Sequence, residues 1–289
     1  MGLTDATCFA DRARYRTVVV RENVKIARDT YRVRFDCPEI AQQIVPGQFL
    51  MMRLSECNDP LLGRPLAFYD VVVDQKGIPV GLDVVYLVVG KFTSRLARAS
   101  AGQQIDVWGP LGNGFTPRPA GHLVMVAGGI GQTPFLALAR EYLGTYVFGD
   151  PPRAAQRAER VTLCYGARSQ EYLAGLEDFT AAGVRVLTST DDGSAGRHGL
   201  VTDVLREVIA AAPRPSHIVC CGPEPMMHAV AEIAKSAQIS CEVSLESPMA
   251  CGIGICFSCV AKVRDASGGW DYRRTCVEGP VFDAATIEF

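Results

Sequence analysis

The chain has 289 residues, of which 48% are hydrophobic and 21% charged, and its formal net charge is −2 at pH 7. This length suits two domains, or three if one is small, and the balanced composition excludes a disordered chain and makes nucleic acid an unexpected partner. The first twenty residues carry scattered charges without an apolar core, so no signal peptide is expected. Apolar runs such as VVYLVV at 84–89 are far shorter than the roughly 18 residues of a membrane span. We therefore expect a cytoplasmic protein without membrane contact.

Short runs rich in β-branched and aromatic residues fill the chain from Thr17 to about Val107, with turn signals at PG, KG and AG between them. The runs read TVVVREN, YRVRFD, LAFYDVVV, VGLDVVYLVV and QQIDVW. Strands of this length and spacing predict an antiparallel barrel or sandwich, which we place at 12–117.

Two features of this first domain suit a flavin dinucleotide. Its pyrophosphate needs a cation and exposed backbone amides, which Arg64 in LLGRPLAFYD and the turn from Gly90 to Ser94 can supply. Each feature is weak alone, because a single arginine more often forms a surface ion pair, and Gly112 and Gly114 read as ordinary loop glycines.

After Pro117 the pattern changes to strands that alternate with glycine turns and helices. HLVMVAGGIGQ leads into TPFLALAREYLG, and VTLCYGA, VRVLTST and HIVCC are further strand candidates. This alternation predicts an α/β domain with a parallel sheet over 118–240. The polar stretch 146–160 is expected to be a solvated insertion without chemistry.

Two turns of this second domain suit a nucleotide. GGIGQTP lies between a strand and a helix, where a helix N-terminus can meet a pyrophosphate, although it is not the G-x-G-x-x-G fingerprint and similar turns occur without nucleotides. CCGPEPMM places Cys221, Gly222 and Pro223 at a carboxyl end of the sheet, where ligands of open α/β sheets bind. The alternative for this second turn is a buried strand end followed by a helix.

The eleven cysteines are unevenly placed, and an odd count in a reducing compartment indicates free thiols or metal ligands. Five stand alone, as small buried hydrophobic residues do: Cys8, Cys37, Cys57, Cys164 and Cys241. The last part of the chain, which we place at 241–289, spaces three thiols as C-x4-C-x2-C and adds a fourth in RRTCVEGPVF. This is the plant-type spacing of a 2Fe-2S cluster, with ligands Cys251, Cys256, Cys259 and Cys276. A zinc site is the alternative, although zinc sites more often use paired C-x2-C units.

The order of six motifs resembles the electron-transfer subunits of B-type dihydroorotate dehydrogenases, in the ferredoxin reductase superfamily, from about Thr17 onward. The motifs are RPLAF, GPLGNGF, GGIGQTP, TDDGSAGRHGLVTDVL, CGPEPMM and MACGIGICFSC. The resemblance implies a multidomain β and α/β fold: an antiparallel FAD-binding β-barrel, a parallel-sheet NAD-binding domain and a small C-terminal 2Fe-2S module. It also implies an FMN-containing catalytic subunit as partner, in a heterotetramer of pyrimidine biosynthesis.

The resemblance also assigns residues to the two nucleotides. For FAD it implies a pyrophosphate contact at Arg64 within Arg64, Pro65, Leu66 and Ala67, and a phosphate turn of Gly90, Lys91 and Thr93. For NAD it implies a loop of Gly128, Gly129 and Gly131 and a strand end of Cys221, Gly222 and Pro223. Ala67 departs from the superfamily, which commonly has Ser or Thr there to hydrogen-bond the flavin edge.

Cofactor chemistry sets the order of carriers that the resemblance implies. Nicotinamide exchanges hydride, a cluster exchanges one electron and a flavin can do both, so electrons would run from dihydroorotate to FMN, the cluster, FAD and NAD without a catalytic acid or base. NADH is weakly preferred to NADPH, because Glu171 follows Arg168 closely and would repel a 2′-phosphate. The alternatives are a subunit of a sulfide dehydrogenase, hydrogenase or ferredoxin:NADP oxidoreductase complex, or a non-enzymatic cluster or zinc scaffold.

Overall fold

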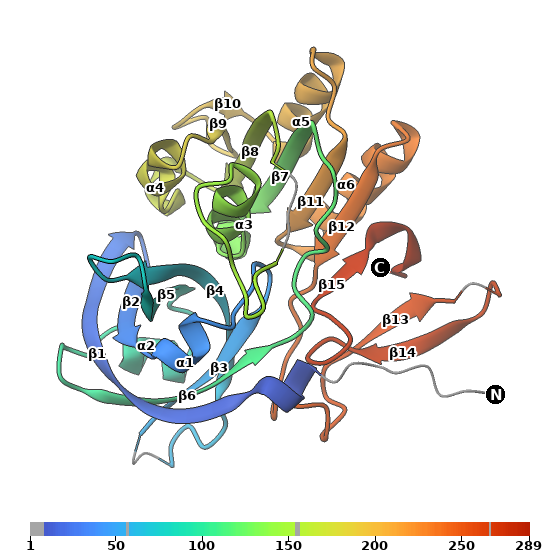
Figure 1. Ribbon diagram of the computed structural model, residues 1–289. Coiled ribbons are helices and arrows are strands. Elements are labelled where there is room, and N and C mark those ends of the chain that lie inside the picture. Colours follow the sequence, from blue (N-terminus) through green and yellow to red (C-terminus); the bar gives the residue numbers. More distant parts are fainter. Residues whose placement is uncertain (1–8, 56–57, 154–156, 266) are drawn as a thin grey trace.

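The computed structural model describes residues 9–55, 58–153, 157–265 and 267–289, so that Cys8, Cys57 and part of the predicted insertion at 146–160 lie outside the described residues. The chain forms a barrel, a larger sheet with helices, and a small hairpin module (Figure 1). No helix among the described residues is long and apolar enough to cross a membrane.

The first domain is a closed antiparallel barrel, as predicted, with the strand order β1-β2-β5-β4-β3-β6. Inward residues such as Val33 and Phe35 alternate with more exposed neighbours, which is the period of two that a strand imposes. The strands are β1 (Arg14–Ala27), β2 (Thr30–Asp36), β3 (Phe49–Leu54), β4 (Arg64–Val73), β5 (Pro79–Leu87) and β6 (Gln104–Leu111), and the barrel carries η1 (Phe9–Arg12), α1 (Pro38–Ala41) and α2 (Lys91–Leu96).

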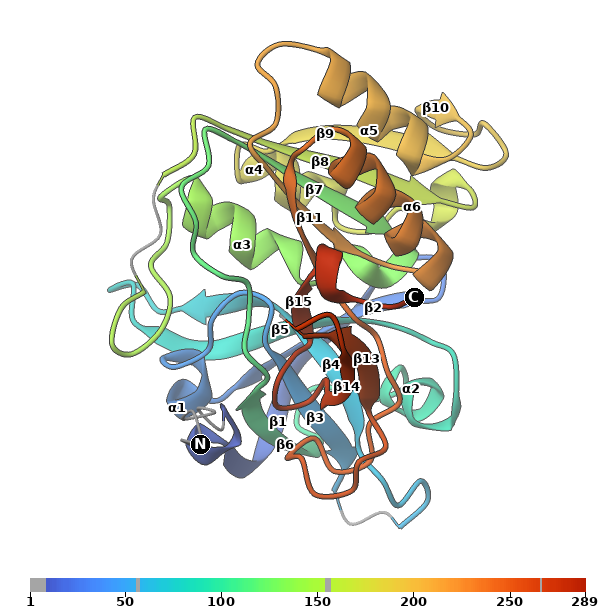
Figure 2. The ribbon, with the colours of Figure 1, turned by 90° about the vertical axis from the view of Figure 1, so that its right-hand side faces the viewer.

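The second domain is a seven-stranded sheet with helices on both faces (Figure 2). Its order is β10-β9-β8-β7-β11-β12-β15, with every neighbouring pair parallel except β12 and β15. The strands are β7 (His122–Gly128), β8 (Arg160–Ala167), β9 (Arg185–Thr190), β10 (Arg197–His198), β11 (His217–Cys221), β12 (Ser240–Ser244) and β15 (Val281–Asp283).

The alternation of buried residues in β7 shows why both faces are covered. Leu123 and Met125 pack with α3 (Phe135–Tyr142) and α4 (Leu176–Ala181), whereas Val124 and Val126 pack with α5 (Val201–Ala210) and α6 (Glu224–Ser236). A strand that is apolar on both sides belongs in the middle of a parallel sheet. The remaining short helices are η2 (Gly129–Gln132), η3 (Gln170–Tyr172) and η4 (Ala284–Thr286).

The cysteine-rich segment projects from the edge of this sheet. Its hairpin consists of β13 (Val260–Arg264) and β14 (Trp270–Arg274), but the flanking strands β12 and β15 belong to the seven-stranded sheet. The range 241–289 therefore supplies two sheet strands as well as the module, because so small a module cannot bury a core of its own. Instead, Phe49, Met51 and Leu111 of the barrel pack against its Met249, Cys259, Cys276 and Val277.

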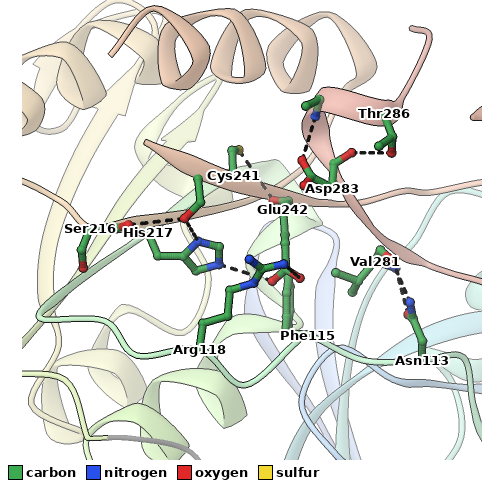
Figure 3. Close-up of polar contacts among 12 residues, drawn as sticks. Asn113, Phe115, Arg118, Ser216, His217, Cys241, Glu242, Val281, Asp283 and Thr286 are labelled. Carbon is green, nitrogen blue, oxygen red and sulfur yellow. Dashed lines mark hydrogen bonds and ion pairs between the residues drawn. The ribbon is translucent and has the colours of Figure 1, made fainter. Parts of the chain in front are cut away.

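The segment that leaves the barrel passes between all three parts and is tied to each. The Asn113 side-chain amide donates to the Glu278 carbonyl at 3.2 Å. It also donates to the Val281 carbonyl at 2.8 Å, and its oxygen accepts from the Val281 amide at 3.2 Å (Figure 3). Five residues further on, Arg118 lies 3.9 Å from the buried carboxylate of Glu242, which also contacts His217 at 3.3 Å (Figure 3).

We predict that Asn113→Ala loosens β15 without unfolding the barrel. The substitution removes the partners of the Val281 amide and of the Val281 and Glu278 carbonyls, which belong to the neck that joins the module to β15. The expected cost in stability is about 1 to 3 kcal/mol. Hydrogen exchange at the Val281 amide should become at least about fivefold faster. Asn113→Asp, which keeps the acceptor for that amide, is the control. Unchanged exchange in Asn113→Ala would show that the side chain does not secure this seam.

Candidate functional site

A cavity of about 610 Å³ lies between the barrel and the sheet, within the size range of cofactor pockets. The residues predicted for FAD come together on its barrel side: Arg64, Pro65, Leu66, Ala67, Gly90, Lys91 and Thr93. Residues of the sheet domain and of the module neck form the other side, including Ile130, Cys221, Ser247 and Met249. This cavity is therefore bounded by all three parts of the fold.

Three polar residues of the barrel side differ in what they present to the cavity. Arg64 donates to the carbonyls of Leu62 and Gly63 at 3.0 Å each, and no carboxylate in the described part of the chain pairs with it. Lys91 forms an ion pair with Asp59, with its Nζ 2.6 Å from Oδ1. Arg64 is thus the cation left to meet a pyrophosphate.

Thr93 acts within the turn. Its buried hydroxyl accepts from the amides of Val89 at 3.0 Å and Gly90 at 3.2 Å. It thereby shapes the Gly90 turn that faces the cavity, as an N-terminal cap does for a helix. Ala67 pairs with Phe49 across β3 and β4 and contributes only a methyl group to the cavity wall.

A second cavity of about 730 Å³ lies at the carboxyl ends of β7, β8, β9 and β11, where ligands of parallel sheets bind. Of the residues predicted for the nucleotide, Gly128, Gly129, Gly222 and Pro223 line it, whereas Cys221 lines the first cavity. Gly131 does not line the second cavity. A Cβ at Gly131 would lie 2.2 Å from the carbonyl oxygen of Cys221, so this glycine lets the turn pack against β11.

The two cavities share one wall, which contains Leu87, Val89, Ile130 and Glu246. Molecules bound in them would meet at this wall. Glu246 opens onto both cavities, and desolvation by the surrounding protein raises the pKa of its carboxyl. Glu246 has no motif of its own in the sequence, and its only signal is its place between the buried strand β12 and the cysteine motif.

The far end of the second cavity carries opposite charges. Arg168 and Asp191 line it together with Ser189, whose buried hydroxyl has no hydrogen-bond partner in the described part of the chain. Glu171 does not line it, because its carboxylate forms an ion pair with Arg28 of the barrel. Asp191, which directly follows β9, is therefore the carboxylate beside Arg168 that is placed to bind a coenzyme ribose, and its signal in the sequence is the TDD that follows VRVLTS.

The four predicted ligand thiols come together in the module as two pairs. Cys251 contacts Cys256, and Cys259 contacts Cys276, with Cys276 also influenced by the charge of Cys251. Among the described residues, no three Cys, His, Asp or Glu side chains lie close enough together to bind a single metal ion. Two pairs of thiols suit a binuclear cluster, in which each iron takes two protein ligands.

The loop around these thiols turns backbone amides inward. Gly252 and Gly254 have φ of +75° and +82°, and the Ile253 amide donates to the sulfur of Cys251 at 3.4 Å. The Ser258 hydroxyl lies 3.2 Å from the sulfur of Cys256. This hydrogen bond is the largest of the interactions that lower the pKa of the Cys256 thiol to about 6. Burial raises the pKa of Cys276 to about 12. The residues present therefore fit an iron–sulfur cluster that is exposed at Cys256 and buried at Cys259 and Cys276.

Comparisons with known proteins assign the three parts. The oxidoreductase FAD-binding domain matches residues 17–115, the oxidoreductase NAD-binding domain 125–232, and the iron-sulfur cluster binding domain of dihydroorotate dehydrogenase B 246–288. The electron transfer subunit of dihydroorotate dehydrogenase B (NAD(+)) from Desulforamulus reducens is 36% identical, over 89% of this chain and 92% of that protein. The chain belongs to this family.

Further relatives of this dihydroorotate dehydrogenase B electron transfer family agree. The subunit from Caldanaerobacter subterraneus subsp. tengcongensis is 33% identical, over 93% of this chain and 97% of that protein. A solved structure of the NADH-dependent reduced ferredoxin-NADP oxidoreductase superimposes with a TM-score of 0.78 at 28% identity, over 94% of this chain and 90% of that one. FAD, NAD and an iron–sulfur cluster are therefore the cofactors of the three sites, and the predicted zinc alternative is set aside.

We predict that Arg64→Ala weakens FAD binding at least about tenfold, because it removes a charge-assisted contact to the pyrophosphate. Ala67→Ser should keep its FAD and change the rate of flavin reduction by NADH less than about tenfold. Flavin retained after dilution and gel filtration measures the first effect, and stopped-flow absorbance the second. Arg98→Ala, at an exposed arginine of the same domain outside the cavity, is the control. Flavin retention without Arg64 would contradict its role.

A further prediction concerns the coenzyme. Asp191→Ser should raise the NADPH to NADH ratio of kcat/KM for flavin reduction at least about tenfold, because it removes a negative charge that would face a 2′-phosphate. Asp192→Ser is the matched control, since the Asp192 carboxylate accepts hydrogen bonds from Ser194 and does not line the cavity. An equal change in both variants would remove Asp191 as the determinant.

Proposed function

We propose that this chain passes electrons between an FMN-containing subunit that oxidises dihydroorotate and NAD, as one step of pyrimidine biosynthesis in the cytoplasm. The arrangement of the three sites carries the proposal. The nucleotide cavity shares a wall with the flavin cavity, and the flavin cavity borders the module that holds the thiols. When bound, nicotinamide supplies hydride chemistry, the cluster one-electron chemistry, and FAD both.

Side chains of this chain separate the site of hydride transfer from the site of one-electron transfer and exclude water between them. Ile130 and Glu246 stand where nicotinamide would approach the flavin. On the other side, Phe49 and Met249 line the flavin cavity and also pack in the apolar cluster that contains Cys259 and Cys276. This packing excludes water between the flavin cavity and the buried thiol pair. Hydride transfer between nicotinamide and flavin requires no side chain that donates or accepts a proton.

The exposed side of the cluster loop is the expected docking face for the catalytic subunit. Cys256 is exposed, and the same cysteine-rich segment carries several solvent-accessible apolar side chains: Ile253, Ile255, Phe257, Val260, Trp270 and Tyr272. Ile255 is 74% and Phe257 63% exposed, and a group of exposed large apolar residues marks an interaction surface. A partner bound here would place its own flavin near the exposed thiol of Cys256. We propose that two copies of each subunit form a heterotetramer.

A second candidate is a subunit that links ferredoxin to NADP. The resemblance to the ferredoxin-NADP oxidoreductase structure favours it, because that chain is matched over nearly its whole length. An exposed cluster would serve a small iron–sulfur donor as well as a flavoprotein. The two proposed functions therefore differ in the partner protein and in the reductant.

The decisive experiment is co-expression with a candidate FMN-containing catalytic subunit, followed by an assay of dihydroorotate-dependent NAD reduction. We expect a stable complex and activity. Ile255→Asp should abolish co-purification while keeping FAD and iron, whereas Ile78→Asp, at an exposed apolar residue in the β4–β5 turn, should not. No complex and no dihydroorotate-dependent activity, together with NADP reduction by reduced ferredoxin, would replace this proposal with the second candidate.

A further inference from the structure

Arg274 lies at the end of β14, beside the loop that carries three of the thiols. Its Nη1 donates to the carbonyl of Gly254 at 3.1 Å, and its guanidinium carbon lies 5.2 Å from the ring centre of Phe257. Both contacts fall inside the loop between Cys251 and Cys259. Phe257 has a positive φ of 54°, so the arginine holds a part of the loop that is not in a relaxed conformation.

The same arginine is anchored in the turn that carries the fourth thiol. The carboxylate of Glu278 accepts from the backbone amide of Arg274 at 2.8 Å and from its Nε at 3.4 Å. The Arg274 carbonyl in turn accepts from the amides of Val277 and Glu278 at 3.1 and 2.8 Å. This closed turn surrounds Cys276, whose thiol lies beside the backbone of Gly254. Arg274 thus connects the two segments that supply the ligands.

Two arginines and two carboxylates lie next to the fourth thiol, and the second carboxylate, Asp271, is exposed and lies 3.9 Å from Arg273. Glu278 also pairs with Arg273, at 2.9 Å from Nη1 to Oε1, so one carboxylate lies between two guanidinium groups. Arg273 points to the outer side, half exposed, whereas Arg274 reaches the loop. Reduction adds one negative charge to the cluster, and a nearby cation that is partly buried stabilises that charge more than an exposed one does.

We propose that Arg274 is a positioning residue of the iron–sulfur cluster, which ties the loop of the first three thiols to the turn of the fourth and raises the cluster's reduction potential. The proposal depends on the presence of the cluster and is independent of which protein docks on this face. It therefore survives or fails separately from the proposed function.

The test is a redox titration of the cluster, followed by electron paramagnetic resonance, on the full chain with FAD bound. Arg274→Gln should lower the equilibrium constant for one-electron reduction at least about threefold, or about 28 mV for a one-electron couple. Glu278→Gln, which removes the carboxylate and leaves both cations, should shift the midpoint in the opposite direction by a similar factor. Arg274→Lys should stay within about threefold of the wild type. Damage to the loop alone would not produce shifts of opposite sign.

Arg273→Gln is the matched control, because it removes the same charge from the same carboxylate without a contact to the loop. Its shift should be smaller than that of Arg274→Gln. If Arg274→Gln fails to retain iron, the Glu278→Gln and Arg274→Lys midpoints decide. The proposal is overturned if Arg274→Gln keeps the wild-type midpoint, if Glu278→Gln lowers the midpoint, or if Arg273→Gln shifts it as much as Arg274→Gln.

Discussion

The pairing of β12 with β15 is the constraint on which the arrangement of the sites depends. Ser244 pairs with Val281, and the Leu245 amide donates to the Pro280 carbonyl at 2.9 Å, so that the cysteine-rich segment leaves and re-enters the sheet at one narrow neck. Leu245, Glu246 and Pro280 of this neck also line the flavin cavity. A segment held at both ends has few positions open to it. The neck therefore sets the thiols beside the flavin cavity without a large core of their own.

The sequence was sufficient for what depends on local pattern. Strand period, glycine turns and the order of motifs predicted the barrel and the parallel sheet, and the spacing of Cys251, Cys256 and Cys259 predicted the cluster. These features need only neighbours in the chain. β15 could not be predicted in the same way, because its three residues have no periodic signal and become a strand only through pairing with β12.

The places where the structure departs from the local pattern of the sequence have the same physical origin. Glu171 follows Arg168 in the chain, but an ion pair with Arg28 of the barrel draws it away from the cavity, and Asp191 from the next strand lies there instead. Gly131 was predicted to belong to the nucleotide loop, and in the structure it packs against the Cys221 carbonyl and does not line the cavity. Both depend on contacts between segments far apart in sequence. Whether Arg64 and Ala67 act on FAD as predicted is a question for binding experiments.

The gradient of exposure across the four thiols links stability to function. Cys259 and Cys276 are buried against barrel residues, and an isolated thiolate there would be costly, since burial raises the pKa of Cys276. Iron ligation offsets that cost, because the bound metal stabilises the thiolate form. Cys256 stays exposed, with Ser258 beside its sulfur. The buried pair thus anchors a cluster to the flavin side of the fold, while the exposed Cys256 leaves one edge open to a partner. A fully buried module would be more stable and would lack that open edge.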